Sequence, residues 1–243
     1  DKIVFDDYHS AIKIIGDNAI IHSDGEFEDY AFYHSRCYDV RVEGLNFFNF
    51  KKALYVGNSF YPDTTNRRES AQWSVVDCSF QNCGEALGIY CMQSMMVVKK
   101  CKFYNNKVAV NIEGADTLTM RDNWISAGAL DNTQDHPGQI INRGVLIFDS
   151  NLLVPLPQTT NPVEPAWIKN YADVTVLNTR HGAEEDSFTL INNFAGGDDL
   201  SDGTNFTEPR SVIVKDSQCN AVYGSIYTPG GEVIYSVPAI LRY

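Results

Sequence analysis

The sequence predicts an all-β chain folded as a right-handed parallel β-helix of about seven or eight rungs. Three observations favour this fold class: an internal repeat of about two dozen residues, strand-like alternation inside each repeat, and no pattern typical of a long amphipathic helix. A sandwich or a jelly roll would also contain short strands, but it would not produce an ungapped repeat of this period.

The repeat is clearest where the segment 73–91 is placed over the segment 96–114 without gaps. The pairs matched in this alignment are Val75 with Val98, Cys78 with Cys101, Phe80 with Phe103, Asn82 with Asn105, Ala86 with Ala109, and Ile89 with Ile112. In stacked rungs each residue faces its copy about 4.8 Å away along the axis, so apolar and Asn positions are expected to recur.

The same pattern extends in both directions along the chain. A longer constant shift aligns Val42, Phe47, Asn49, Ala53 and Val56 with Val75, Phe80, Asn82, Ala86 and Ile89, and the polar stretch 58–72 absorbs the difference. The pairs predicted for the Val98 and Phe103 slots of later rungs are Met120 and Ile125, Ile147 and Leu152, Val176 and His181, and Val214 and Cys219.

The domain prediction follows from the strength of the repeat. One β-helix domain covers residues 1–243, with weaker rungs at 1–34, which include a candidate strand at 12–15, clear rungs at 35–220, and a C-terminal cap at 221–243. The first residue is not Met, which favours a domain of a longer polypeptide.

Charge and hydropathy exclude several partners. The chain has 31 acidic and 19 basic residues, for a formal net charge of -12. This excess of acid opposes binding to nucleic acid or to an anionic membrane surface; it is compatible with neutral or basic ligands, or with solubility alone. No apolar run approaches the roughly 20 residues that span a bilayer, so membrane insertion is not predicted.

Two columns of the repeat carry a structural interpretation. Cys78 and Cys101 occupy one slot in adjacent rungs and are interpreted as buried free thiols, with a disulfide as the alternative in an oxidising compartment. Asn49, Asn82 and Asn105 are interpreted as turn residues that hydrogen-bond along the stack. The cysteine spacing does not fit a zinc site, and no metal ligands are predicted.

The insertions between strands are where a solenoid carries function. Three leave just after the Phe slot in successive rungs, at 127–142, 154–167 and 182–186, and we expect them to project side by side and to wall a groove. Two others, at 58–72 and 196–210, leave after the third strand of a rung and are expected along a different edge.

The three side-by-side insertions supply the candidate site. The predicted catalytic residues are Asp135, Glu184 and Glu185. The predicted substrate-binding residues are Arg180, His136, Trp167, Asp131 and Glu164. Carboxylates can act as acid and as nucleophile or base in glycoside hydrolysis, and aromatic faces stack on sugar rings. The alternatives are solvated loop acids and core packing for Trp167.

Other chemistries find less support. The sequence contains no GxxxxGK[ST], GxGxxG, HExxH or GxSxG motif. The acidic loop 198–203 could hold Ca²⁺ through its carboxylates, although it lacks EF-hand spacing and a closing Glu. No cofactor is therefore predicted, with Ca²⁺ as the alternative.

Three stretches resemble the pectate-lyase-like superfamily in the form found in bacteriophage tail spikes. They are 73–84 with its copy at 97–106, 151–155 followed by 166–171, and 178–184 followed by 192–194. In the last stretch Arg180-His181-Gly182-Ala183-Glu184 stands where the superfamily pattern reads Arg-Phe-Gly-Gly-Glu, so this match is partial. The likeness covers about residues 35 to 220.

The resemblance implies a homotrimer in the virion tail, or outside the cell, that recognises and often cleaves a bacterial surface polysaccharide. It transfers Arg180 and Glu184 as groove residues. Classical pectate lyases of the superfamily use Ca²⁺, and no matching acidic cluster lies on consecutive rungs, so a hydrolase is favoured over a lyase. The alternatives are a non-catalytic structural or adhesin β-helix and a stand-alone secreted polysaccharide lyase or hydrolase.

Overall fold

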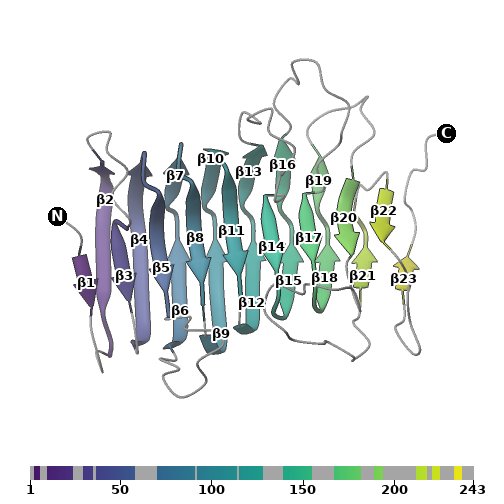
Figure 1. Ribbon diagram of the computed structural model, residues 1–243, viewed down its shortest axis with the longest axis horizontal. Helices are drawn as coiled ribbons and strands as arrows, with labels where there is room; N and C mark the ends of the chain where they lie inside the picture. The colour runs from purple at the N-terminus through teal and green to yellow at the C-terminus, as the bar shows by residue number, and fades with distance from the viewer. Residues whose placement is uncertain are drawn as a thin grey trace.

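The computed structural model is a stack of parallel strands that winds along one axis, with the N-terminal strands at one end and the C-terminal strands at the other (Figure 1). The residues that the structure describes are 3–5, 10–23, 30–34, 37–57, 70–90, 92–113, 115–127, 139–154, 167–181, 189–193, 212–217, 221–224 and 233–236. Every strand pairing among the described residues is parallel, as a β-helix requires.

Two sheets contain these strands. Sheet A has nine strands, which in spatial order are β1 (Ile3–Phe5), β3 (Phe32–His34), β5 (Lys52–Val56), β8 (Glu85–Ile89), β11 (Val108–Ile112), β14 (Ile140–Asn142), β17 (Ile168–Asn170), β20 (Thr189–Asn193) and β22 (Ala221–Gly224). The repeat predicts seven or eight rungs, and strands at both ends extend this sheet to nine.

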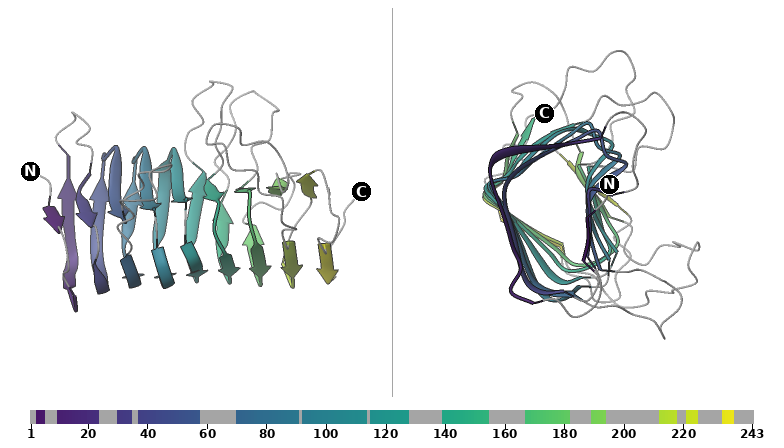
Figure 2. Two further views of the ribbon diagram at one scale, coloured as in Figure 1. Left: turned by 60° about the horizontal axis from the view of Figure 1, so that its bottom comes forward. Right: turned by 90° about the vertical axis from the view of Figure 1, so that its left-hand side faces the viewer.

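Sheet B has fourteen strands because most rungs contribute two. Its first leg contains β2 (Lys13–His22), β4 (Tyr38–Phe48), β6 (Ser70–Val76), β9 (Met92–Lys99), β12 (Ala115–Arg121), β15 (Leu146–Asp149), β18 (Val174–Leu177), β21 (Val212–Lys215) and β23 (Val233–Ser236). Its second leg contains β7 (Ser79–Gln81), β10 (Lys102–Asn106), β13 (Trp124–Ala127), β16 (Leu152–Val154) and β19 (Arg180–His181). Strand β4 runs through both legs, since it pairs with β6 and with β7. Seen end on, the rungs trace one repeated outline (Figure 2).

The register confirms the predicted repeat over the central rungs. Val75 pairs with Val98, Phe80 with Phe103, and Ile89 with Ile112, as the ungapped alignment requires. The longer shift toward the N-terminus is confirmed by pairs such as Phe47 with Phe80. The weaker N-terminal rung is also present, because β2 pairs with β4. The fold is therefore the predicted right-handed parallel β-helix.

One predicted register is wrong by a single position. Met120 pairs with Phe148 and Ile125 pairs with Leu153, so Phe148 and Leu153 occupy the slots predicted for Ile147 and Leu152. Because side chains alternate between the two faces of a strand, this slip moves Leu152 to the outer face, where it is 37% exposed. The next rung returns to the predicted slots with Val176 and His181.

Single residues with positive φ turn the chain at the corners of each rung. The corner between the two legs of sheet B is occupied in successive rungs by Gly44, Asp77, Lys100, Asp122, Ser150, Asn178 and Asp216. Asn49, Asn82 and Asn105 turn the chain after the second leg, with φ between 54° and 61°. Asn105 Nδ2 donates to Asn82 Oδ1 at 2.7 Å, which confirms the predicted Asn column.

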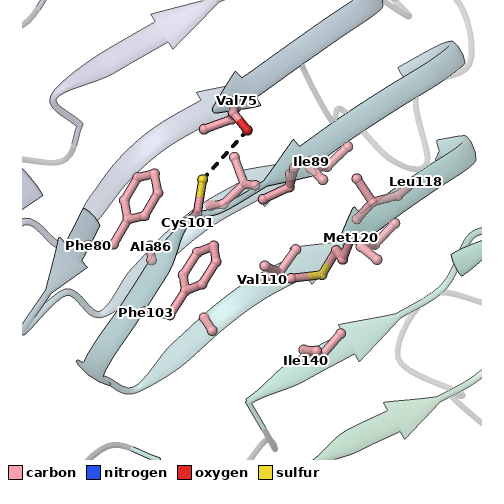
Figure 3. Close-up of a cluster of buried hydrophobic side chains, with 14 of the residues drawn as sticks. Val75, Phe80, Ala86, Ile89, Cys101, Phe103, Val110, Leu118, Met120 and Ile140 are labelled. Carbon is pink, nitrogen blue, oxygen red and sulfur yellow. Dashed lines mark hydrogen bonds between the residues drawn. The ribbon is translucent and has the colours of Figure 1, made fainter. Parts of the chain in front are cut away.

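The interior of the stack is filled by aligned apolar side chains (Figure 3). The fully buried rings of Phe47, Phe80 and Phe103 stack with centroid distances of 5.0 and 5.1 Å. Cys78 and Cys101 are buried free thiols, as predicted, and Cys101 Sγ donates to the Val75 carbonyl at 3.5 Å. The predicted Cys219 slot lies outside the described residues.

Candidate functional site

The ends of the three predicted side-by-side insertions are placed by neighbouring strands. They leave from β13, β16 and β19, which are consecutive in sheet B, and return to β14, β17 and β20, which are consecutive in sheet A (Figure 1). Ser126 pairs with Val154 at the first two exits. The insertions therefore start at the same edge of the stack, as the prediction of a shared face requires.

Most predicted site residues lie within these insertions and outside the described part of the chain. These residues are Asp131, Asp135, His136, Glu164, Glu184 and Glu185. The acidic loop 198–203, the alternative Ca²⁺ site, also lies outside it.

Two predicted substrate-binding residues, Trp167 and Arg180, lie in the described part of the chain, and one is buried while the other is exposed. Trp167 is only 6% exposed and belongs to the hydrophobic core, and its carbonyl accepts a hydrogen bond from the Ile140 N–H. This burial favours the core-packing alternative for Trp167, since a buried ring offers no face to a ligand. Arg180 is exposed on β19, at the exit of the third insertion.

Arg180 belongs to a line of residues on the outer face of the second leg of sheet B, which we name the outward column. The register aligns Ser79 with Lys102, Lys102 with Trp124, Trp124 with Leu152, and Leu152 with Arg180. The next residue of each of the first four strands is the buried Phe80, Phe103, Ile125 or Leu153, so the column members face outward by alternation.

The centre of the outward column carries an aromatic pair. Tyr104, which follows Lys102 and the buried Phe103 on β10, stacks on Trp124 with ring centroids 5.9 Å apart and planes inclined by 12°. Tyr104 is 40% exposed, Trp124 is partly exposed, and the apolar Leu152 lies on the next strand. Exposed ring faces on a rigid sheet can stack on sugar rings, and the cations beside them can bind polar groups.

Lys102, Tyr104 and Trp124 are absent from the site that the sequence predicts. Their signal is present in the repeat, because the residues flanking the Phe slot in the alternation must face outward. These positions lie on the strands themselves and not in the insertions. Only the register shows that Lys102, Trp124 and Leu152, which are far apart in the sequence, form one line.

A second polar cluster covers the outer face of sheet A. Asn111 Nδ2 lies 3.0 Å from Glu85 Oε2, 3.1 Å from the Tyr90 hydroxyl and 3.4 Å from Glu113 Oε1. The Tyr90 hydroxyl also donates to Glu85, at 3.1 Å to Oε1. Lys52 Nζ lies 4.0 Å from the same carboxylate. The cluster thus joins β5, β8 and β11 through side chains.

Burial sets the electrostatics of this cluster. Desolvation raises the pKa of Glu113, an effect that the nearby Arg143 guanidinium opposes, and burial beside Glu85 raises the pKa of Tyr90 far above its ordinary value. Gly88 makes room for the Tyr90 ring, which a Cβ there would approach to 2.7 Å. Because Glu85 and Tyr90 are mostly buried and bonded to each other, we assign this cluster to holding the sheet together.

The described residues give no support for a metal centre or a membrane span. Within the ranges that the structure describes, no three His, Cys, Asp or Glu side chains gather in positions that could hold a metal ion. The same ranges contain no helix long and apolar enough to cross a membrane.

Comparison with known proteins agrees with the observed architecture. A family model described as right handed beta helix region matches residues 3–154. No curated protein and no solved structure matches the chain significantly. A β-helix domain of this kind suggests, in general, a module that binds or processes polysaccharide. Because the model matches more than half of the chain, the chain belongs to the right-handed β-helix family.

Proposed function

We propose that this chain is a receptor-binding module of the tail-spike type, which binds a bacterial surface polysaccharide along the outward column. The observation that carries the proposal is the Tyr104–Trp124 pair, in which Tyr104 is exposed and Trp124 partly exposed; Trp124 lies on β13, from which the first insertion leaves. A polymer lying along the axis would meet the members of this column one after another, since each belongs to a different rung.

The rest of the proposal rests on the resemblance to tail spikes. In this proposal the module acts in the virion tail or elsewhere outside the cell, and it assembles as a homotrimer. Side-by-side packing of solenoids would also cover flanks and exposed ends, which gives a physical reason for assembly.

Binding is tested with a panel of purified bacterial capsular polysaccharides and lipopolysaccharides. We expect Trp124→Ala and Tyr104→Ala each to weaken the best interaction about tenfold, because each removes one ring of the stacking surface. The matched control is Tyr38→Ala, because Tyr38 is 38% exposed on β4 at the start of the other leg of sheet B. Equal affinities for all three variants would contradict the proposal.

Cleavage is a separate part of the proposal and has its own measurement. The release of reducing ends from the same panel is compared for the wild type, Glu184→Gln and Asp135→Asn. Release that disappears in either variant would identify a depolymerase that uses the insertions. Release that persists in both would assign cleavage to other residues.

A non-catalytic adhesin is the second candidate function, and one observation favours it. The described residues of β7, β10, β13, β16 and β19 include exposed aromatic rings but no Asp or Glu, so the outward column by itself contains no carboxylate pair for hydrolysis. Binding that depends on Trp124, together with no reducing-end release from any glycan, would favour the adhesin.

A further inference from the structure

The outward column contains two cations, Lys102 and Arg180. Lys102 and Arg180 are both exposed, and the register places Trp124 and Leu152 between them. Three strand spacings separate the two cations, or about 14 Å along the axis. This distance is longer than one sugar ring, so the two charges would meet different units of a polymer.

Neither of these two cations has a carboxylate partner among the described residues, which is also true of exposed lysines such as Lys107 and Lys215. Elsewhere Arg41 pairs with Glu43 at 2.7 Å, Lys52 with Glu85 at 4.0 Å, and Arg121 with Asp149 at 3.5 Å. The strands that form the outward column, over their described residues, contain no Asp or Glu at all. The strands of the column therefore contribute two positive side chains, Lys102 and Arg180, and no carboxylate, on a chain whose net charge is -12.

The local charge decides what can bind there. At physiological ionic strength the Debye length is about 8 Å, so distant carboxylates are screened while charges in contact with a ligand are not. An Arg guanidinium matches a carboxylate geometrically and can form two parallel hydrogen bonds with it. The net charge favours neutral or basic ligands, whereas the outward column favours an anionic one.

We propose that the outward column selects an acidic polysaccharide, whose sugar carboxylates meet Lys102 and Arg180 while a sugar ring stacks on Trp124. This inference rests on the proposed function, because it assumes that the column is the glycan-binding surface, and it adds the chemical class of the glycan. The apolar Leu152 next to Trp124 extends the surface available to a sugar face.

The test uses purified capsular polysaccharides that carry uronic acids, each compared with its carboxyl-reduced, neutral form. We expect the acidic form to bind more tightly, with an affinity that falls as salt rises. Lys102→Gln and Arg180→Gln should each weaken binding of the acidic form about fivefold and weaken binding of the reduced form less, because the charge-assisted bonds need a carboxylate. Lys215→Gln, which removes an exposed cation on β21, is the matched control and should change neither affinity.

The outcomes separate this inference from the proposed function. If both forms bind equally and only Trp124→Ala weakens them, the acidic preference is wrong while the glycan-binding surface stands. If no polysaccharide binds, both proposals fail. If a single-stranded oligonucleotide displaces the acidic glycan at equal concentration, the column is a general anion-binding strip and the inference is overturned.

Discussion

Buried positions near the turns are filled differently in the earlier and later rungs of the stack. In one column the thiols of Cys78 and Cys101 are followed by the amides of Asn123 and Asn151. Sheet A makes a similar change, because its column of Val56, Ile89 and Ile112 continues as Asn142 and Asn170. In these columns the early rungs carry apolar or thiol groups, whereas the later rungs carry polar groups, which are amides in both columns and then the hydroxyls of Thr179 and Ser217 in the first.

The difference shows that one backbone accepts two kinds of interior. The early rungs depend on shape, as in the stacked rings of Phe47, Phe80 and Phe103. The later rungs depend on complete hydrogen bonding: Asn151 Oδ1 accepts from both Asn123 N and Asn123 Nδ2 at 2.9 Å. Columns filled by apolar side chains should tolerate substitution by an apolar side chain of similar volume. Columns filled by amides should tolerate only side chains that form the same hydrogen bonds.

Phe80→Ala should have the largest effect. It removes a fully buried ring that lies between two others, and we expect the free energy of unfolding to fall by about 4 kcal/mol. Phe80→Leu is the control, because Leu153 fills the same slot in a later rung, and it should cost less than about 1.5 kcal/mol. Urea unfolding measures both; equal losses would mean that ring volume is unimportant there.

Asn151→Ala should be the next most costly change. It leaves two donors of Asn123 without their acceptor and removes the bond from Asn151 Nδ2 to the Met120 carbonyl, so we expect a loss of about 3 kcal/mol. Thr175→Ala, on the outer face of β18, should change the unfolding free energy by less than about 0.5 kcal/mol. Similar small losses for both variants would refute the role given to the amide column.

Cys101→Asn should convert one slot from the early to the later type at a cost below about 1 kcal/mol. Cys101 Sγ already donates to the Val75 carbonyl, and Asn123 Nδ2 donates to the equivalent Val98 carbonyl one rung later. An Asn side chain at position 101 could therefore donate to the Val75 carbonyl in the same way. Cys101→Leu adds volume without a partner and should cost about 2 kcal/mol. The opposite order of the two losses in urea unfolding would show that the columns are not interchangeable.

Asp149→Asn should have the smallest effect, because it changes an outer corner and not a buried column. The bond from Asn178 Nδ2, then that from Ser150 Oγ and the Arg121 charge, lower the pKa of Asp149. A lowered carboxyl pKa stabilises the fold at pH values above the ordinary value of about 4, and this contribution is lost as the pH falls through the lowered pKa. The free energy of unfolding of the wild type should therefore exceed that of the variant by less than about 1 kcal/mol at pH 7. A pH series of urea unfolding should show this advantage disappearing in acid, and an advantage that persists there would contradict the assignment.

The sequence repeat does not determine the register at Ile147 and Leu152. Ile147 and Phe148 are both apolar, and so are Leu152 and Leu153, so hydropathy cannot decide which member of each pair faces inward. The structure decides it through Asn151, which must lie beside Asn123 to complete the buried hydrogen bonds. Aligning these two Asn positions in the sequence would have selected the correct shift.

The predicted site residues Arg180 and Trp167 show the same difference between what the sequence predicts and what the structure decides. The position of Arg180 beside the insertions predicts it as a site residue, and the structure exposes it there. Residue type and a place at the end of the insertion 154–167 predict Trp167, and the structure buries it, because a side chain at the entrance of β17 can face either the core or the solvent. Residue type indicates what a position can bind, but the direction of the side chain indicates whether it is available.

The sequence by itself determined the parallel β-helix, the residues that form its central columns and the edge from which the insertions leave, because stacked rungs repeat their apolar and Asn positions at a readable period. Only the tertiary structure decided that Lys102, Trp124, Leu152 and Arg180 form one line, since rungs of unequal length separate them in the sequence. Residues that are far apart in the sequence become neighbours because the hydrogen-bond register of the paired strands places them on adjacent rungs, which are about 4.8 Å apart.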